Sequence, residues 1–214
     1  LQVIFVGDFF QLPPVSRGEN VRFAFDSDAW KAANPVVCYL SEQHRQEDAA
    51  FLDLLNAVRR GEVEDVHYES LRSRMKRVSE KKKVTRLHTH NAEADRINDE
   101  SLAEVDGKTH VFQMTTKGSR TLVDALKQNA LSPETLVLKE GATVMFTRNN
   151  FDMGYVNGTL GEVVGFANSG YPIVKTKRGD RIEAVPGEWS IADGSKILAQ
   201  IKQVPLRLAW AITV

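Results

Sequence analysis

The chain begins with a nearly continuous apolar run, LQVIFV at positions 1–6, and this run points to one fold class. Val, Ile and Phe without regular polar alternation are typical of a parallel strand that is covered on both faces. The run stops at Gly7 and Asp8, and in an open α/β sheet ligands bind where such strands end. We therefore predict an α/β fold with a ligand site directly after this strand.

The composition is that of an ordinary globular protein with one sizeable domain or two modest ones: 214 residues, of which 42% are hydrophobic and 26% charged. The 28 basic and 28 acidic side chains cancel, which argues against coating of nucleic acid by bulk charge. The single cysteine, Cys38, excludes an intramolecular disulfide and favours an intracellular location. The sequence shows no signal peptide and no membrane span of about 20 apolar residues, so no membrane partner is expected. Both ends fall within apolar runs, which suggests a piece of a longer protein.

Local signals predict a mixture of helices and strands up to residue 106. Asp26 or Ser27 is expected to cap a short helix that stops at Asn34-Pro35. A second buried strand is expected at VVCYL, residues 36–40. A helix that ends at Gly61 is predicted by the helical spacing of four apolar residues, Phe51, Leu54, Leu55 and Val58. Further elements are expected at 64–76 (helix), 84–87 (strand) and 91–106 (a helix capped by Asn91).

After Gly141 the pattern changes to short strands separated by turn residues. Such a pattern predicts a small β-barrel or meander inserted into the α/β domain. The segment PLRLAWAITV, at the end of the sequence, is expected to return to the parent sheet. Trp189 and Trp210 are expected to belong to the core. The strands are expected at 142–146, 160–166, 171–177, 180–185 and 196–204.

The segment VGDFFQLPPV, residues 6–15, carries the first candidate chemistry. Gly7 allows the backbone to approach a bound group closely, and Asp8 suits binding of a metal-bound water or orientation of its neighbour. The neutral amide of Gln11 suits sensing of a terminal phosphate and its attacking water. Pro13-Pro14 fixes the following backbone as extended, so a shift at Gln11 would be transmitted. The alternative is a strand followed by a proline-rich loop in which Gln11 is merely exposed.

This segment resembles motif III of the superfamily 1 DNA helicases, especially the PIF-type and RecD-like group. Further segments match in the expected order. Residues 40–62 resemble motif IV and the helix behind it, and 86–99 the first strand and helix of the second RecA-like domain. Residues 141–150 and 155–166 resemble the start of an SH3-like insertion, and 205–214 the start of motif V. The resemblance covers nearly the whole chain and implies the C-terminal portion of such a helicase, from motif III to the start of motif V.

The resemblance implies a RecA-like fold of the P-loop NTPase type with an inserted SH3-like β-barrel. Its domains would be the tail of a first RecA-like domain (1–41), a second one (42–162 and 203–214) and the SH3-like insertion (163–202). It implies a fragment of an ATP-dependent helicase that moves 5′ to 3′ on single-stranded DNA. ATP and Mg²⁺ are the implied cofactors, bound mainly by parts of the protein outside this chain.

The implied partners are single-stranded DNA and duplex–single-strand junctions. The motor would be monomeric or a subunit of a larger complex, with roles in DNA repair, recombination or telomere maintenance. Its implied location is the cytoplasm or nucleoid of a bacterium or phage, or the nucleus or mitochondrion of a eukaryote.

Arg45 matches the arginine finger of the family, and a guanidinium grips phosphate oxygens through a planar fork. The resemblance implies that Gln11 and Arg45 meet the γ-phosphate from two sides. Asp8, Gln11 and Arg45 are thus the candidate catalytic residues, and Gly7, Gln11 and Arg45 the candidate nucleotide contacts. The alternative is that Arg45 is an exposed arginine paired with a nearby glutamate.

Thr89, His90 and Asn91 stand between a strand and a helix, where backbone amides form a natural phosphate site. The resemblance implies contact with a single-strand backbone there, while the alternative is that Asn91 only caps the helix. Asn157-Gly158 is first of all a hairpin turn signal. We reject His88 and His90 as metal ligands, and no metal site is predicted. The remaining nucleic-acid candidates, with the resemblance as their basis, are Phe10, Pro14, Val15, Asn157 and Gly158.

No G-x-x-x-x-G-K-[ST] phosphate loop occurs in the sequence. We therefore predict that this chain alone neither binds ATP tightly nor hydrolyses it. Two alternatives to the helicase motor stay open. One is the RecD-like α chain of a recombination exonuclease complex. The other is a non-hydrolysing nucleic-acid-binding or adaptor module derived from a helicase.

Overall fold

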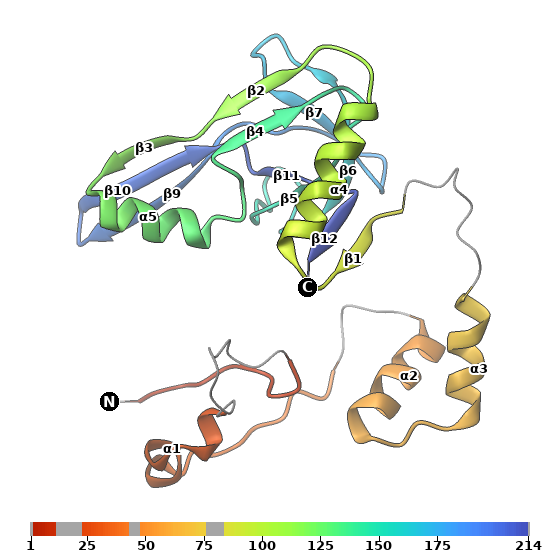
Figure 1. Ribbon diagram of the computed structural model, residues 1–214. Coiled ribbons are helices and arrows are strands. Elements are labelled where there is room, and N and C mark those ends of the chain that lie inside the picture. Colours follow the sequence, from red (N-terminus) through yellow and green to blue (C-terminus); the bar gives the residue numbers. More distant parts are fainter. Residues whose placement is uncertain (1, 12–22, 43–47, 76–83, 214) are drawn as a thin grey trace. The chain divides into compact units, whose positions relative to one another are not determined.

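The computed structural model describes residues 2–11, 23–42, 48–75 and 84–213, so Pro13-Pro14, Val15 and Arg45 lie outside the described residues. The chain divides into two compact units, Leu1–Val78 and Ser79–Val214 (Figure 1). Within the described parts of both units, every helix is too short or too polar to cross a membrane.

The helices of the first unit begin and end at the residues that local signals predict. Ser27 caps α1 (Asp28–Ala33), because its hydroxyl accepts a hydrogen bond from the Trp30 amide at 3.2 Å. A short 3-10 turn, η1 (Ala24–Asp26), precedes it. α2 (Ala49–Arg60) ends at Gly61, whose φ of 72° lies in the left-handed region. α3 (Asp65–Arg74) follows directly. The helix predictions for this unit are therefore confirmed to within about two residues.

The two buried strands predicted for the first unit are wrong. The described residues of 1–6 and all of 36–40 are extended but belong to no strand, and Val6 and Leu40 are 90% and 95% exposed. The physical reason is that a strand needs a hydrogen-bonded neighbour, and the described residues of this unit include no other strand. The N-terminal segment instead packs its aromatic rings against α1. The ring centroids of Phe5 and Phe9 lie 5.6 and 5.8 Å from that of Trp30.

The second unit contains a parallel pair of strands covered by a helix. β1 (Arg86–His88) pairs with β12 (Ala211–Thr213), and α4 (Asn91–Glu104) packs against β12. A parallel pair must be joined by a crossover connection, here the whole intervening chain. The predicted return of the last segment to the parent sheet is thereby confirmed. His90, rather than Asn91, occupies the cap position of α4.

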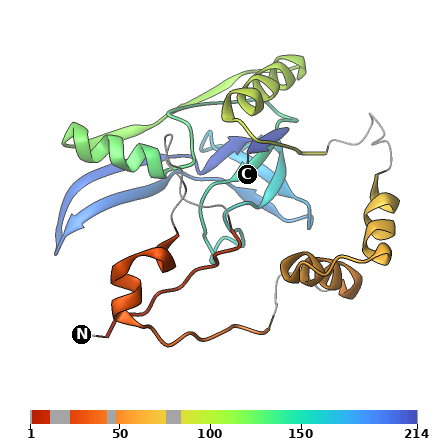
Figure 2. The same ribbon diagram turned by 60° about the horizontal axis from the view of Figure 1, so that its bottom comes forward.

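Residues 108–140, for which we made no prediction, form a hairpin-like pair and a helix. β2 (His110–Gln113) pairs with β4 (Thr135–Leu138), and α5 (Arg120–Asn129) lies along one face of a three-stranded sheet (Figures 1 and 2). That face buries Val123 and Leu126 of the helix against Ile201 of the sheet. The sheet has the order β3-β10-β9, formed by Thr115–Gly118, Lys196–Gln203 and Gly187–Asp193.

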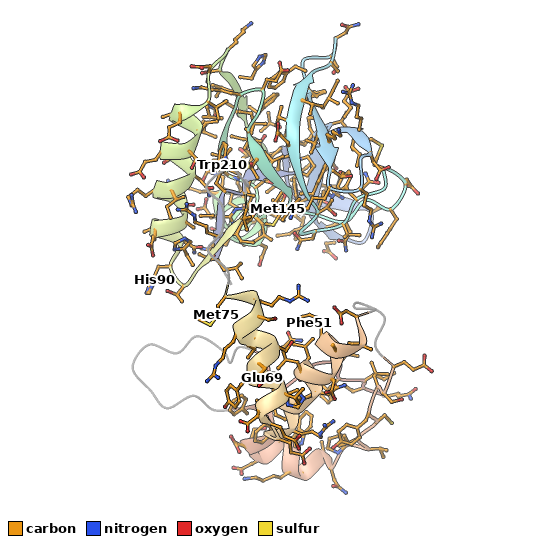
Figure 3. All side chains as sticks on the ribbon, turned by 90° about the vertical axis from the view of Figure 1, so that its right-hand side faces the viewer. Phe51, Glu69, Met75, His90, Met145 and Trp210 are labelled. Carbon is orange, nitrogen blue, oxygen red and sulfur yellow. The ribbon has the colours of Figure 1, made fainter. Side chains whose placement is uncertain are left out.

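The larger core belongs to a five-stranded antiparallel sheet. Its order is β11-β5-β6-β7-β8, formed by Leu206–Leu208, Thr143–Phe146, Leu160–Phe166, Pro172–Thr176 and Arg181–Glu183. The five strands predicted after Gly141 are confirmed as β5, β6, β7 and β8 of this sheet and β10 of the three-stranded sheet. β9 is an additional strand that we did not predict. Trp210 packs against this core (Figure 3), and Trp189 packs against the smaller core.

The predicted SH3-like barrel is not confirmed. The described strands form four separate sheets of five, three, two and two strands, and none of these sheets closes on itself. The insertion boundaries that we placed after residues 162 and 202 lie within β6 and β10. The backbone bonds of both strands continue across these positions. The α/β class itself is confirmed by the parallel strand pair and its covering helix.

Candidate functional site

Asp8, a predicted catalytic residue, is held by several hydrogen bonds. Its Oδ2 and Oδ1 atoms accept hydrogen bonds from Nη1 and Nη2 of Arg59 at 3.1 and 2.9 Å. The backbone amide of Phe10 donates to the same Oδ1 at 3.1 Å. The Arg59 guanidinium, followed by the Phe10 amide, holds the pKa of the Asp8 carboxyl below its usual value of 3.8. Asp8 is therefore an ionised, oriented group at neutral pH.

Phe10 and Gln11 stand on the same exposed turn as Asp8. The backbone amide of Gln11 donates to the Asp8 carbonyl oxygen at 3.2 Å, which closes the turn. Phe10 is 73% exposed, and the Arg59 guanidinium carbon lies 4.7 Å from the centroid of its ring. A side chain at Gly7 would meet no described atom within 4 Å, so the space beside this backbone is open. The structure thus brings Asp8, Phe10 and Gln11 together and adds Arg59 to them.

Sequence reasoning missed Arg59, because arginines in the last turn of a surface helix are common and only a long-range contact distinguishes this one. Its neighbour Arg60 pairs with Glu62, two residues away, at 2.7 Å. Pro14, Val15 and Arg45 lie outside the described residues. The convergence of Gln11 and Arg45 on one phosphate therefore stays a prediction.

Among the described residues, no cluster of possible metal ligands lies near this turn. Both oxygens of Asp8 accept hydrogen bonds from Arg59, which leaves this carboxylate better suited to orient a neighbour than to bind a metal. Nowhere in the described part of the chain do three or more His, Cys, Asp or Glu side chains gather as metal ligands would.

Thr89, His90 and Asn91 lie together at the carboxyl end of β1, where α4 begins. All three are exposed, and Figure 3 shows His90 at the end of this helix. The Thr89 hydroxyl lies 2.8 Å from Nδ1 of His90. His90 occupies the cap position but accepts no hydrogen bond from the helix amides through its side chain. A helix N-terminus with short polar side chains beside it suits a phosphate group.

Two residues that sequence reasoning missed hold this edge in place. The hydroxyl of Thr213, at the end of β12, donates to Oδ1 of Asn91 at 2.6 Å. Asn98 is 3% exposed, and its amide exchanges two hydrogen bonds of 2.8 and 2.9 Å with the backbone of Ala211. A polar residue on the buried face of a predicted amphipathic helix was the available signal for Asn98.

Asn157 and Gly158 form the turn that their sequence predicts. Gly158 has a φ of 89°, and its amide donates to the Phe146 carbonyl oxygen at 2.9 Å. The backbone amide of Asn157 donates to Oδ1 of Asn149 at 2.8 Å. Both residues are exposed on the connection that leads into β6. The turn is confirmed, whereas the contact of these residues with DNA stays a prediction.

Comparisons of sequence and of structure lead to the same group of proteins. The family model of the DNA helicase Pif1 2B domain matches residues 121–166. The ATP-dependent DNA helicase Pif1 of Psychrobacter sp. (strain PRwf-1) is 36% identical over an alignment that covers all of this chain and 42% of that protein. The chain therefore spans less than half of that curated relative.

Solved structures of Pif1 show the same fold. The crystal structure of Bacteroides sp. Pif1 in complex with ADP-AlF4 matches 96% of this chain and 51% of that chain, with a TM-score of 0.80 and 25% identity. Bacteroides Pif1 bound to ssDNA matches 80% of this chain and 41% of that chain, with a TM-score of 0.51 and 25% identity. In sequence and in fold, the chain is similar to a portion of the PIF1-type helicases.

Proposed function

We propose that this chain is the part of an ATP-dependent DNA helicase that senses the bound nucleotide and grips single-stranded DNA. The observation that carries the proposal is the similarity of the entire chain to an ATP-dependent DNA helicase Pif1. A Pif1 structure of the same fold holds the nucleotide complex ADP-AlF4, and another holds ssDNA. The intact protein would couple ATP hydrolysis to 5′ to 3′ translocation along one strand.

On the nucleotide side, Gln11 and Arg45 have complementary roles. The exposed amide of Gln11 presents donors and an acceptor to the terminal phosphate and the attacking water. The Arg45 guanidinium stabilises the negative charge that develops on that phosphate. Asp8, held by Arg59, orients the turn that carries Gln11. MgATP supplies the phosphoryl group and would be held mainly by residues outside this chain.

On the DNA side, the first turn of α4 binds a backbone phosphate. Its amides point out of the helix beside the exposed side chains of Thr89, His90 and Asn91. The remaining contacts are assigned to Phe10, Pro14, Val15, Asn157 and Gly158. Aromatic and apolar side chains among them suit stacking on the faces of unpaired bases. Such stacking would allow DNA of any base sequence to bind.

Unwinding assays with the full-length protein that carries this sequence test the proposal. We expect ATPase activity that single-stranded DNA stimulates, and unwinding of a duplex with a 5′ tail but not of one with a 3′ tail. Arg45→Ala should abolish turnover while DNA binding persists, and Arg60→Ala serves as the matched control. Unwinding from a 3′ tail would contradict the direction. DNA binding without any ATPase would favour a non-hydrolysing adaptor, and normal turnover of Arg45→Ala would refute the finger.

A further inference from the structure

Arg59 contacts the Gly7–Gln11 turn in two chemically different ways. Its guanidinium forms a two-pronged ion pair with Asp8, with bonds of 3.1 and 2.9 Å. The same guanidinium lies over the Phe10 ring at 4.7 Å from the centroid. Fifty-one positions separate Asp8 from Arg59 in the sequence, so these contacts join two remote segments of the first unit.

The geometry of this contact leaves the turn little freedom. A planar fork on a carboxylate fixes both the direction and the rotation of the Asp8 side chain. The Asp8 Oδ1 atom also accepts from the Phe10 amide, and the Asp8 carbonyl oxygen accepts from the Gln11 amide. Displacement of the guanidinium therefore displaces Asp8, Phe10 and Gln11 as a group.

The base of the contact is a well-defined helix. α2 is capped at its start by Asp48, whose carboxylate accepts from the Ala50 and Phe51 amides, and it ends at Gly61 in the left-handed conformation. Leu54 and Ala57 are buried on one face. Arg59 therefore projects from a helix whose ends and packing are both defined.

An ordinary surface ion pair would contribute little, because solvent screens it and its long side chains lose conformational entropy. Arg60 illustrates such a pair, since it contacts only the nearby Glu62 among the partners described for it. Arg59 differs by its bidentate geometry, by its aromatic partner and by the remoteness of the segment that it holds.

We propose that Arg59 is a positioning residue that ties the nucleotide-sensing turn to α2. It holds Gln11 at the phosphate and Phe10 toward DNA, so that a change at one is conveyed to the helix and to the other. This inference rests on the proposed function, which assigns Gln11 and Phe10 to those two ligands. Arg59 itself touches neither ATP nor the reacting atoms in this mechanism.

The test compares Arg59→Ala, Arg59→Lys and the control Arg60→Ala in the full-length protein. The first readout is the turnover number of DNA-stimulated ATPase, with the KM for ATP. We expect Arg59→Ala to lose about 10- to 100-fold in turnover, as misplaced catalytic groups do, with little change in KM. Arg59→Lys should recover only part of the loss, because an ammonium provides no fork. Arg60→Ala should stay within about twofold of the unsubstituted protein.

A double-mutant cycle separates positioning from a general loss of stability. In an Asp8→Asn background, where the ion pair is already lost, Arg59→Ala should cause little further loss of turnover. Additive losses would overturn the proposal. Equal losses in Arg59→Ala and Arg60→Ala, or full recovery by lysine, would overturn it as well.

A second readout does not depend on activity. Hydrogen–deuterium exchange at the Phe10 and Gln11 amides should accelerate in Arg59→Ala but not in Arg60→Ala, because the turn loses its anchor. Unchanged exchange and unchanged turnover in Arg59→Ala would refute the role of Arg59. If the unsubstituted protein shows no DNA-stimulated ATPase, the proposed function fails. The exchange data then still decide whether Arg59 fixes the turn.

Discussion

Asn98 shows how one buried amide can position a binding edge. It belongs to α4, yet its side chain satisfies both the N–H and the C=O of Ala211 on β12, and a longer bond of 3.5 Å reaches the Leu208 carbonyl oxygen. These hydrogen bonds connect α4 directly to the backbone of β12. They fix the edge at which Asn91 and Thr213 meet.

We predict that Asn98→Ala destabilises the chain by about 1–3 kcal/mol, because it leaves buried backbone groups of Ala211 without partners. Urea unfolding provides the measurement. Asn129→Ala is the matched control, since the Asn129 amide bonds only its own helix, at the Ala125 carbonyl, from an exposed position. That control should cost less than about 0.5 kcal/mol. Equal costs for the two variants would contradict the assigned role of Asn98.

Asp8 yields a prediction about pH. Its folded pKa lies below the usual 3.8 because of Arg59 first and the Phe10 amide second. A group with a depressed folded pKa stabilises the fold above its unfolded pKa and loses this effect as pH falls through the folded value. The Asp8–Arg59 contact should therefore persist unchanged from neutral pH down to the usual 3.8 and disappear only below it.

Carboxyl carbon NMR of Asp8 through an acid titration measures this pKa directly. In Arg59→Ala the midpoint should rise toward the ordinary value, since the principal cause of the depression is gone. Arg60→Ala should leave the midpoint where it is, because Arg60 pairs with Glu62 instead. A midpoint that Arg59→Ala does not move would show that the ion pair is absent in solution.

At the scale of elements, β3 and β10 approach each other closely at a glycine. Gly118, at the end of β3, has a φ of 113° and lies opposite Ala199. A Cβ atom there would overlap the Leu198 carbonyl oxygen and the Ala199 Cα. Glycine at this position thus allows the small sheet to form beneath α5.

We predict that Gly118→Ala costs about 1–3 kcal/mol from backbone strain and a similar amount from overpacking. Gly170→Ala is the matched control, because Gly170 also has a positive φ, 86°, but open space around it. The control should show only the strain. Thermal unfolding of the two variants would separate backbone strain from overpacking. Equal decreases in the unfolding temperature would show that the β3–β10 contact accommodates the added methyl group without loss of stability.

The success of prediction from sequence also differed between kinds of element. Helix ends in the first unit depend on local chemistry, such as the Ser27 cap and the left-handed Gly61, and so they were predictable. The strands expected at 1–6 and 36–40 failed, because pairing depends on partners that no local pattern specifies. α5 carries the amphipathic spacing of Leu122, Val123 and Leu126, which would have been a usable signal.

At the scale of the whole molecule, the order of motifs was more informative than any single residue. It led to the helicase family, which the comparisons support along the entire chain. It also led to a closed barrel, where the described strands form open sheets. Family likeness therefore fixed the class of fold, while the long-range contacts of Arg59, Asn98 and Thr213 became visible only in three dimensions.

The balanced charge of the whole chain gives a final prediction about DNA binding. With 28 basic and 28 acidic side chains, binding must come from a few local contacts such as the first turn of α4. If about two phosphates are neutralised, the logarithm of the affinity for oligo-dT falls with that of salt at a slope of about −1.4, or about sevenfold between roughly 50 and 200 mM. Fluorescence anisotropy measures this slope. Asn91→Ala should weaken binding at every salt concentration, whereas Asn129→Ala should not. A slope steeper than about −3 would mean that a broad basic surface, rather than this helix end, holds the strand.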